Sequence, residues 1–292
     1  MTIAKPGHAR GLPEYRNALV AADPLWEAMS AMGTFTAKGR DFEHAWHIRQ
    51  ETADARLWWV GEEACELLTH AAPTMPVVTL TRELVPDETG FVCFERPLIG
   101  KDADHRDVEV RVDFLSWFGS TVQIGGGVDC LSILAWQQLD EVCVPLGRAD
   151  WPYGADSDSD LPVEMSSTAL ESIIEDRRVL AAMWQLSSQP SITDTEEVAP
   201  DRATQRRLAR RGQPVAPVRV MNLASRQRSP AATGAAGGRE YQRRWIVEGH
   251  WRQQACGPGW SQHRPVWIAP HVKGPEGKPL VATESVKVWK GT

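Results

Sequence analysis

Val108-Glu109-Val110-Arg111-Val112-Asp113-Phe114 decides the fold, because apolar and charged residues alternate along it without a break. Successive side chains of a β-strand point to opposite faces, so this alternation predicts a strand with one buried face and one wet face. Further strands are predicted at residues 91–98 and 129–136, with a short edge strand at 142–145. Their close spacing along the chain favours an antiparallel meander over alternating βαβ units.

Helices are predicted before and after these strands. One begins at Asp23-Pro24, since proline suits the first position of a helix. A long helix is predicted over residues 41–70, where apolar residues recur at steps of three, four and seven. Two more are predicted at 168–186, which begins with a capping box, and at 201–211, whose acidic end comes first. A strand is predicted at 215–223, and the fold class is therefore α+β, with helices plus an antiparallel meander sheet.

The end of the chain is predicted to form a basic C-terminal three-stranded antiparallel sheet. Its strands are residues 241–254, 265–270 and 284–290, and the turns between them carry Gly and Pro. We expect two parts in the chain. Residues 1–160 form an acidic α+β part with two helices and the meander sheet, and residues 161–292 form a basic part with helices and the three-stranded sheet.

Charge is distributed unevenly between the ends of the chain. Residues 201–292 contain 17 Lys+Arg and 5 Asp+Glu, which is a formal +12. Subtracting these from the totals of 32 and 38 leaves 15 basic and 33 acidic residues in 1–200, a formal −18. A basic region of this kind favours an anionic partner, most simply a nucleic acid.

Composition excludes several classes of protein. No apolar run approaches the length of a membrane span, and the first residues lack the apolar core of a signal peptide. The five cysteines are scattered without a Cys-x-x-Cys pair, which indicates buried thiols in a reducing compartment. We therefore expect a cytoplasmic protein without a membrane partner, cofactor or metal site.

Strand alternation sorts residues 241–252 into two faces. Trp245, Val247 and Trp251 share one face and are expected to pack on the core. Arg244, His250 and Arg252 share the other, where guanidinium groups suit phosphate. The alternative is a wet face with ion pairs such as Arg244–Glu248. The predicted nucleic-acid-binding residues are Arg206, Arg210, Arg243, Arg244, His250, Arg252, His263, Arg264, His271 and Lys273.

The arginines of the predicted helix 201–211 allow two interpretations. They form an electrostatic footprint for a nucleic acid or an acidic protein. Equally, they can dock onto the acidic residues of the chain itself, because opposite fields attract within a molecule as well as between molecules.

Three histidines leave an enzymatic alternative open. His250, His263 and His271 lie in or beside neighbouring predicted strands. Metal-independent RNA cleavage needs only a general base, a general acid and charge stabilisation, so a phosphodiesterase is an alternative function. We expect that the three histidines do not converge and that at least one is held by a structural hydrogen bond. No catalytic residue is assigned.

A motif in the same region resembles a known group of proteins. It reads Trp245-Ile-Val-Glu-Gly-His250-Trp-Arg252-x-Gln254, followed by Ser261-x-His263-Arg264-Pro-Val-Trp267-Ile-x-Pro270-His271-x-Lys273-Gly274-Pro275. This pattern resembles the C-terminal region of an uncharacterised family from actinobacterial phages and plasmids. It is more distantly similar to a phage anti-CRISPR family that suppresses production of the type V-A CRISPR nuclease. The resemblance covers residues 164–290 and is strongest over 239–280.

The resemblance implies a phage-type regulatory or counter-defence protein, anti-CRISPR-like, that acts on a nascent polypeptide and its message. Together with the basic region, it leads to the expectation of a non-enzymatic protein that binds RNA or a ribonucleoprotein target. A module that contacts only a host protein, without nucleic acid, is the remaining alternative.

Overall fold

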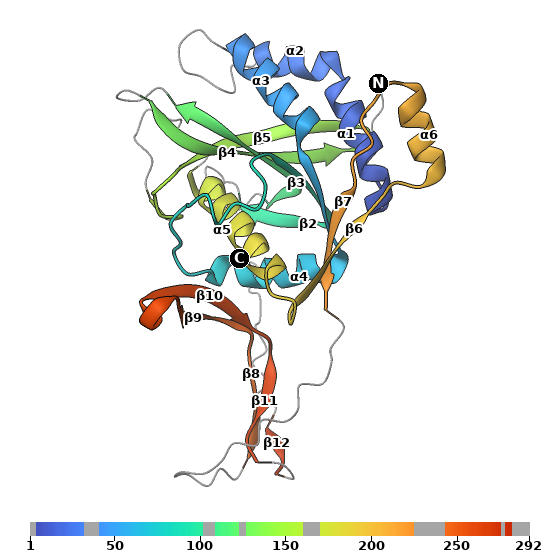
Figure 1. The fold of residues 1–292 in the computed structure, drawn as a ribbon. Helices are drawn as coiled ribbons and strands as arrows, with labels where there is room; N and C mark the ends of the chain where they lie inside the picture. The colour runs from blue at the N-terminus through green and yellow to red at the C-terminus, as the bar shows by residue number, and fades with distance from the viewer. Residues whose placement is uncertain are drawn as a thin grey trace. The chain divides into compact units, whose positions relative to one another are not determined.

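The computed structural model describes residues 4–31, 41–101, 109–122, 127–159, 170–224, 243–275 and 278–281. The chain forms two compact units, unit 1 from Met1 to Ala224 and unit 2 from Ser225 to Thr292. Unit 1 contains the main sheet and helices α1 to α6, and unit 2 contains short strands (Figure 1).

Unit 1 is built on a seven-stranded mixed sheet in the order β5-β4-β3-β2-β1-β7-β6. The strands are β1 Arg56–Val60, β2 Gly90–Lys101, β3 Glu109–Val122, β4 Val128–Leu139, β5 Val142–Pro152, β6 Thr193–Val198 and β7 Val218–Leu223. Strands β2 to β5 are antiparallel neighbours, as the meander predicts. Strand β1, however, is parallel to both β2 and β7. The fold is α+β, but the prediction of an antiparallel meander is wrong for the sheet as a whole.

The long helix predicted over residues 41–70 is wrong because a strand interrupts it. Helix α3 (Asp41–Asp54) is followed by β1, and α4 (Glu62–Ala71) begins after Gly61. The four residues from Leu57 to Val60 are all buried. A central parallel strand is covered on both faces and therefore has no alternation, so its apolar run resembles a buried helix segment.

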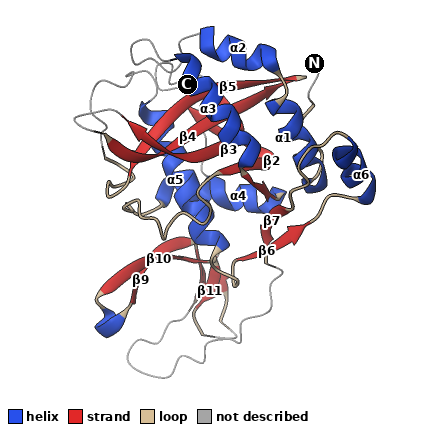
Figure 2. Ribbon diagram, turned by 45° about the horizontal axis from the view of Figure 1, so that its top comes forward, coloured by secondary structure: helices blue, strands red, loops and turns tan. Residues whose placement is uncertain are grey.

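Helices cover both faces of the sheet in unit 1. Their bounds are α1 Leu12–Val20, α2 Asp23–Ala31, α3 Asp41–Asp54, α4 Glu62–Ala71, α5 Leu170–Ser187 and α6 Arg202–Arg210, with short 3-10 turns at Ala9–Gly11 and Ala72–Thr74. One core contains residues of α1, α2 and α3 together with Trp59 and Phe114 of the sheet. On the opposite face the indole of Trp117 meets that of Trp184 in α5. Figure 1 and Figure 2 show the resulting three layers.

Several local predictions are confirmed. Helix α2 begins at Asp23-Pro24, and β7 lies within the predicted strand at 215–223. Helix α6 has Asp201 as its N-cap, whose carboxylate accepts a hydrogen bond of 2.8 Å from the Thr204 amide. None of the described helices is long and apolar enough to cross a membrane.

The predicted parts, 1–160 and 161–292, differ from the two units. Strand β7 pairs with β1 in the middle of the large sheet, with Leu57 opposite Val218. Helix α5 and strand β6 likewise belong to unit 1. The charge reversal near residue 200 therefore does not mark a structural boundary, because a pairing between distant strands holds this segment in unit 1.

Unit 2 contains two small sheets in its described residues. Strands β9 (His250–Cys256) and β10 (Gln262–Ile268) form an antiparallel hairpin. A three-stranded sheet has the order β11-β8-β12, with β8 Arg244–Val247, β11 His271–Lys273 and β12 Leu280–Val281. The prediction of one antiparallel three-stranded sheet is therefore wrong, although 241–254 and 265–270 do pair. The predicted strand 284–290 lies outside the described residues.

Gly249 explains why the predicted strand 241–254 is divided. A Cβ atom at this position would lie 2.6 Å from Cζ2 of Trp267 and 3.2 Å from Cδ of Pro270. The chain leaves β8 at Val247 and enters β9 at His250. The close approach of an indole to bare backbone therefore requires glycine at this break.

Four of the five cysteines are buried, as the sequence predicts. They are Cys65, Cys93, Cys130 and Cys143, whereas Cys256 in β9 is half-buried. Burial raises the pKa of the Cys65 thiol to about 11 and that of Cys143 to about 12. Thiolate is the reactive form, so the buried groups are protected both by sterics and by protonation.

We predict that a maleimide modifies the native protein at Cys256 alone. The buried thiols react only after unfolding, because the folded protein keeps the reagent away from them. Peptide mass spectrometry after brief labelling, with and without guanidinium chloride, measures this. Native labelling of Cys93 at a rate similar to that of Cys256 contradicts the packing of the sheet.

Candidate nucleic-acid interface

The β9–β10 hairpin carries the densest group of predicted site residues. Seven residue pairs connect its strands, from Gln262 opposite Cys256 to Ile268 opposite His250. Residues that face one another across a ladder share a side of it. One side therefore carries Trp251, Gln253, Ala255, His263, Pro265 and Trp267, and the other carries His250, Arg252, Gln254, Cys256, Gln262, Arg264, Val266 and Ile268.

The side with the tryptophans holds the hairpin together. Trp251 and Trp267 lie opposite each other in register, and their rings pack edge to face at 5.3 Å with an interplanar angle of 71°. Trp267 and Pro265 are buried. Such a pair adds about 0.5–1.5 kcal/mol beyond the area that it buries. Trp251 thus packs against its hairpin partner Trp267, but it is only half-buried and is not one of the buried core residues, in contrast to the prediction.

The opposite side presents the positive charge, and we call His250, Arg252, Gln254 and Arg264 the basic face. Its two arginines are exposed. Arg252 lies opposite Val266 and Arg264 lies opposite Gln254, so the arginines are diagonal neighbours. The Arg252 Nη2 donates a hydrogen bond of 2.5 Å to Oε1 of Gln254, which fixes its direction along the strand.

Carboxylates are scarce around the basic face. From Gly249 to Pro275 the sequence has no Asp or Glu. In the described residues of unit 2 the single carboxylate is that of Glu248, and within those residues no ion pair joins it to Arg244, Arg252 or Arg264. The ion pairs of the alternative interpretation, such as Arg244–Glu248, are therefore not formed among the described residues of unit 2.

The tip of the hairpin exposes a large aromatic side chain. Trp260 ends the 3-10 turn Pro258–Trp260 and is 69% exposed. The turn passes through left-handed backbone at Gly257, Gly259 and Trp260, with φ values of 75°, 62° and 61°. Left-handed backbone is uncommon for a bulky residue, so the turn holds this indole outward at a local cost in energy.

The three histidines are not brought together. His250 belongs to the basic face, whereas His263 lies on the other side of the same hairpin. His271 is in β11 of the other sheet, opposite Val247. His250 Nδ1 lies 3.0 Å from the Glu248 carbonyl oxygen, and His271 Nδ1 lies 3.1 Å from that of Ala269. A paired general acid and base is not formed by these residues.

The remaining predicted residues are divided between two places. Arg243, Arg244, His271 and Lys273 belong to the β11-β8-β12 sheet or its entrance. Arg244 is half-buried, and its amide donates to the Pro279 carbonyl oxygen at 2.9 Å. Arg244 and Arg252 therefore do not share one continuous strand face, which corrects the face predicted for 241–252.

Arg206 and Arg210 are exposed on α6 of unit 1. Their neighbour Arg207 pairs with Glu14 of α1 at 2.6 Å, and Arg211 lies 4.0 Å from the same carboxylate. Part of the charge of this helix is thus neutralised within the chain. This agrees with the self-docking interpretation for Arg207 and Arg211 and leaves Arg206 and Arg210 facing solvent.

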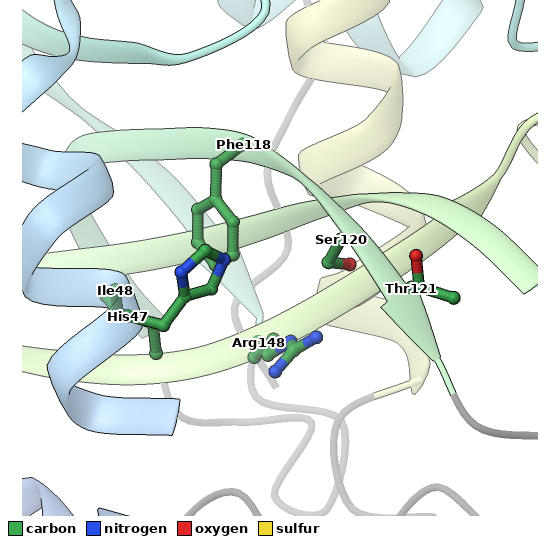
Figure 3. Close-up of a pocket in the computed structure, with 6 residues that line it drawn as sticks. All are labelled: His47, Ile48, Phe118, Ser120, Thr121 and Arg148. Carbon is green, nitrogen blue, oxygen red and sulfur yellow. The ribbon is translucent and has the colours of Figure 1, made fainter. Parts of the chain in front are cut away.

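A second candidate site in unit 1 was missed by the sequence analysis. A pocket of about 170 Å³ is lined by His47, Ile48, Phe118, Ser120, Thr121 and Arg148 (Figure 3). These residues come from α3, β3 and β5. The spacing Arg148-x-Asp150 places both side chains on one face of a strand, but no pattern reveals which residues of β3 lie beside them.

No cluster of three or more His, Cys, Asp or Glu side chains that could hold a metal occurs within the described ranges. No family model matches the chain, and no curated protein matches it.

Proposed function

We propose that this protein is a non-enzymatic regulatory protein that binds single-stranded RNA through the basic face of unit 2. In keeping with the resemblance of its C-terminal motif, we propose a phage-type counter-defence role in the cytoplasm, on a message or its ribonucleoprotein. The exposed pair Arg252 and Arg264, without a carboxylate partner among the described residues, is the observation that carries the proposal.

Three features support RNA over other partners. Guanidinium groups bind phosphate bidentately, and two of them lie on one hairpin side. Gln254 lies beside them with amide groups that can donate and accept. Trp260 at the tip offers an exposed ring of the kind on which unpaired bases stack. Basic grooves combined with stacking aromatics are typical of proteins that bind single strands.

Anisotropy of a labelled single-stranded RNA, titrated at several salt concentrations, tests the proposal. We expect the double variant R252A/R264A to weaken binding about tenfold or more at low salt. The slope of log K against log salt should become shallower by about 1.4, since each phosphate contact on a single strand contributes about 0.7. W260A should weaken binding about fivefold or more with the slope unchanged, because stacking involves no counterion release.

The matched control removes the same charge elsewhere. Arg10 and Arg82 are exposed residues of unit 1, so R10A/R82A changes the net charge equally without touching the hairpin. Equal losses in both double variants would indicate attraction by net charge alone and would reject the basic face. R206A/R210A tests the predicted contribution of α6 in the same titration.

The enzymatic alternative predicts a different result. If purified protein cleaves the RNA without metal, and H250A or H263A abolishes cleavage with the circular dichroism spectrum unchanged, the phosphodiesterase replaces our proposal. Absence of RNA binding by the wild type at low salt, with a protein partner bound through unit 2, would favour the interaction module.

A further inference from the structure

The pocket of unit 1 is supported by a buried network whose hydrogen bonds can be assigned a direction. Ser132 is buried and donates its hydroxyl proton to Oδ1 of the buried Asp150 at 2.5 Å. Ser120 Oγ lies 2.6 Å from Ser132 Oγ. A hydroxyl has one proton, so Ser120 must be the donor of this second bond. The lone pairs of Ser120 then remain as acceptors on the pocket side.

Arg148 belongs to the same hydrogen-bond network, and some of its N–H groups have no partner among the described residues. Its Nε and Nη2 donate to Oδ1 of Asp150 at 3.0 and 2.8 Å, and Nη2 also donates to Ser132 Oγ at 2.8 Å. A guanidinium has five N–H groups, and the described contacts use only the Nε and Nη2 edge. Nη1 has no hydrogen-bond partner among the described residues, and Arg148 lines the pocket, so we assign Nη1 as the donor to a ligand there.

Charge in the network is balanced. The positive charge of Arg148 is offset by Asp150, whose side chain is only 4% exposed. On the other wall, His47 lies 3.7 Å from the carboxylate of Glu51. An anion entering the pocket would meet a guanidinium that is already paired, so a neutral ligand is favoured over a charged one.

The opposite wall is formed by the rings of His47 and Phe118 and by Ile48, and it suits a ring. The rings of His47 and Phe118 meet edge to face at 5.5 Å, and buried Ile48 lies beside them. Figure 3 shows these rings apart from the Ser120 and Thr121 hydroxyls, with Arg148 between the two groups. A cavity of about 150 Å³ holds one benzene ring, so about 170 Å³ accommodates a single substituted ring.

We propose that this pocket binds a small neutral cyclic amide or imide. Its carbonyl oxygen accepts from Nη1 of Arg148, and its adjacent N–H donates to Ser120. Ser120 and the Arg148 guanidinium are neighbours, because Oγ of Ser120 and Nη2 of Arg148 both contact Oγ of Ser132. This site is independent of the RNA-binding hairpin, and it assigns unit 1 the role of sensing a small molecule.

Uracil is the probe that tests the pocket, because it presents a carbonyl beside an N–H on a single ring. Saturation-transfer NMR and calorimetry on the full chain should detect binding with a Kd on the order of 1 mM. We expect 1,3-dimethyluracil, which lacks both N–H groups, to bind at least tenfold more weakly. Uridine distinguishes a free base from a nucleoside as the natural ligand. If uridine binds more weakly than uracil, the pocket takes free bases, and if the two bind equally, it takes nucleosides.

Two variants locate the site. S120A removes the acceptor and should abolish detectable uracil binding, whereas S188A, at an exposed serine, should leave it unchanged. R148K keeps a positive charge beside Asp150 but loses the guanidinium N–H groups that would reach the ligand, so it should also abolish uracil binding. It therefore tests the site independently if S120A fails to fold. Benzoate binding more tightly than uracil, or equal uracil binding by wild type, S120A and R148K, overturns the proposal.

Discussion

Replacing Asp113 by Asn is expected to lower the free energy of unfolding by about 3 kcal/mol at neutral pH, because its partners lose a buried carboxylate. The side chain is fully buried and accepts from Lys5 Nζ at 2.7 Å, from Arg111 Nη2 at 2.9 Å and from the Gln138 amide at 3.0 Å. This loss lies at the lower end of the range for a broken buried ion pair, because the half-exposed guanidinium of Arg111 can be hydrated when its partner is removed.

The pH dependence of this effect has a defined sign. Burial alone would raise the pKa of Asp113, but hydrogen bonds from Arg111 and Lys5 hold the pKa of this carboxyl below its usual value. Its contribution to stability is therefore complete above the unfolded-state pKa of about 3.9 and is lost as the pH falls through the lower folded-state value. Urea unfolding of wild type and D113N should differ most above pH 5, and the difference should shrink progressively as the pH falls below about 4.

D194N is the matched control, because Asp194 is exposed on edge strand β6. It should change the free energy of unfolding by less than about 0.5 kcal/mol. A loss in D113N no larger than that in D194N would contradict the arrangement of Lys5 and Arg111 around a buried carboxylate.

Gly90→Ala should destabilise unit 1 by about 3 kcal/mol or prevent its folding. A Cβ atom at residue 90 would lie 2.1 Å from Cζ2 and 2.4 Å from Cε2 of Trp117. That indole is buried, and its Nε1 donates to the Asp87 carbonyl oxygen at 2.9 Å, so it cannot easily move away. Overpacking of a tightly filled core typically costs about 1–3 kcal/mol, and the rigid ring places this site at the upper end.

Gly119→Ala supplies the comparison within the same sheet. A Cβ atom at Gly119 of β3 meets nothing within 4 Å. Thermal unfolding followed by tryptophan fluorescence should show a transition near that of the wild type for G119A and a much lower one for G90A. Similar transitions for the two variants would show that Trp117 does not cover Gly90.

Local signals predicted local structure well. Asp201 at a helix start and the alternation from Val108 to Phe114 each depend on neighbouring residues, and α6 and β3 form there. The predicted wet face of this strand is wrong at Asp113, which is buried. The Leu57–Val60 segment was misinterpreted because its apolar run has no period of its own. Only its parallel pairing with β2 and with the distant β7 makes it a strand.

The two candidate sites also differ in how far they could be predicted from the sequence. The basic face could be predicted only in part, because alternation placed His250 and Arg252 on one side, whereas the break at Gly249 removed Arg244 and the hairpin register added Gln254 and Arg264. The pocket could not, since Ser120, Ser132 and Arg148 lie on three strands whose register depends on bulges and turns. One such irregularity lies in the pairing of β4 with β5, where Ala135 is opposite Gly147 but the next residue, Trp136, is opposite Pro145, so β5 has one extra residue there.

The pairing of β1 with β7 also affects how the protein can fold during its synthesis. The ribosome synthesises β1 long before β7. During this interval the edge of β1 that pairs with β7, in the segment that contains Trp58 and Trp59, has unpaired backbone groups. Chains synthesised in the cell emerge at about 5–20 residues per second, and unpaired apolar strand edges invite aggregation during that wait. A chain that stops before Val218 lacks the strand that pairs with this edge. The large sheet of unit 1 is therefore complete only after β7 has been synthesised.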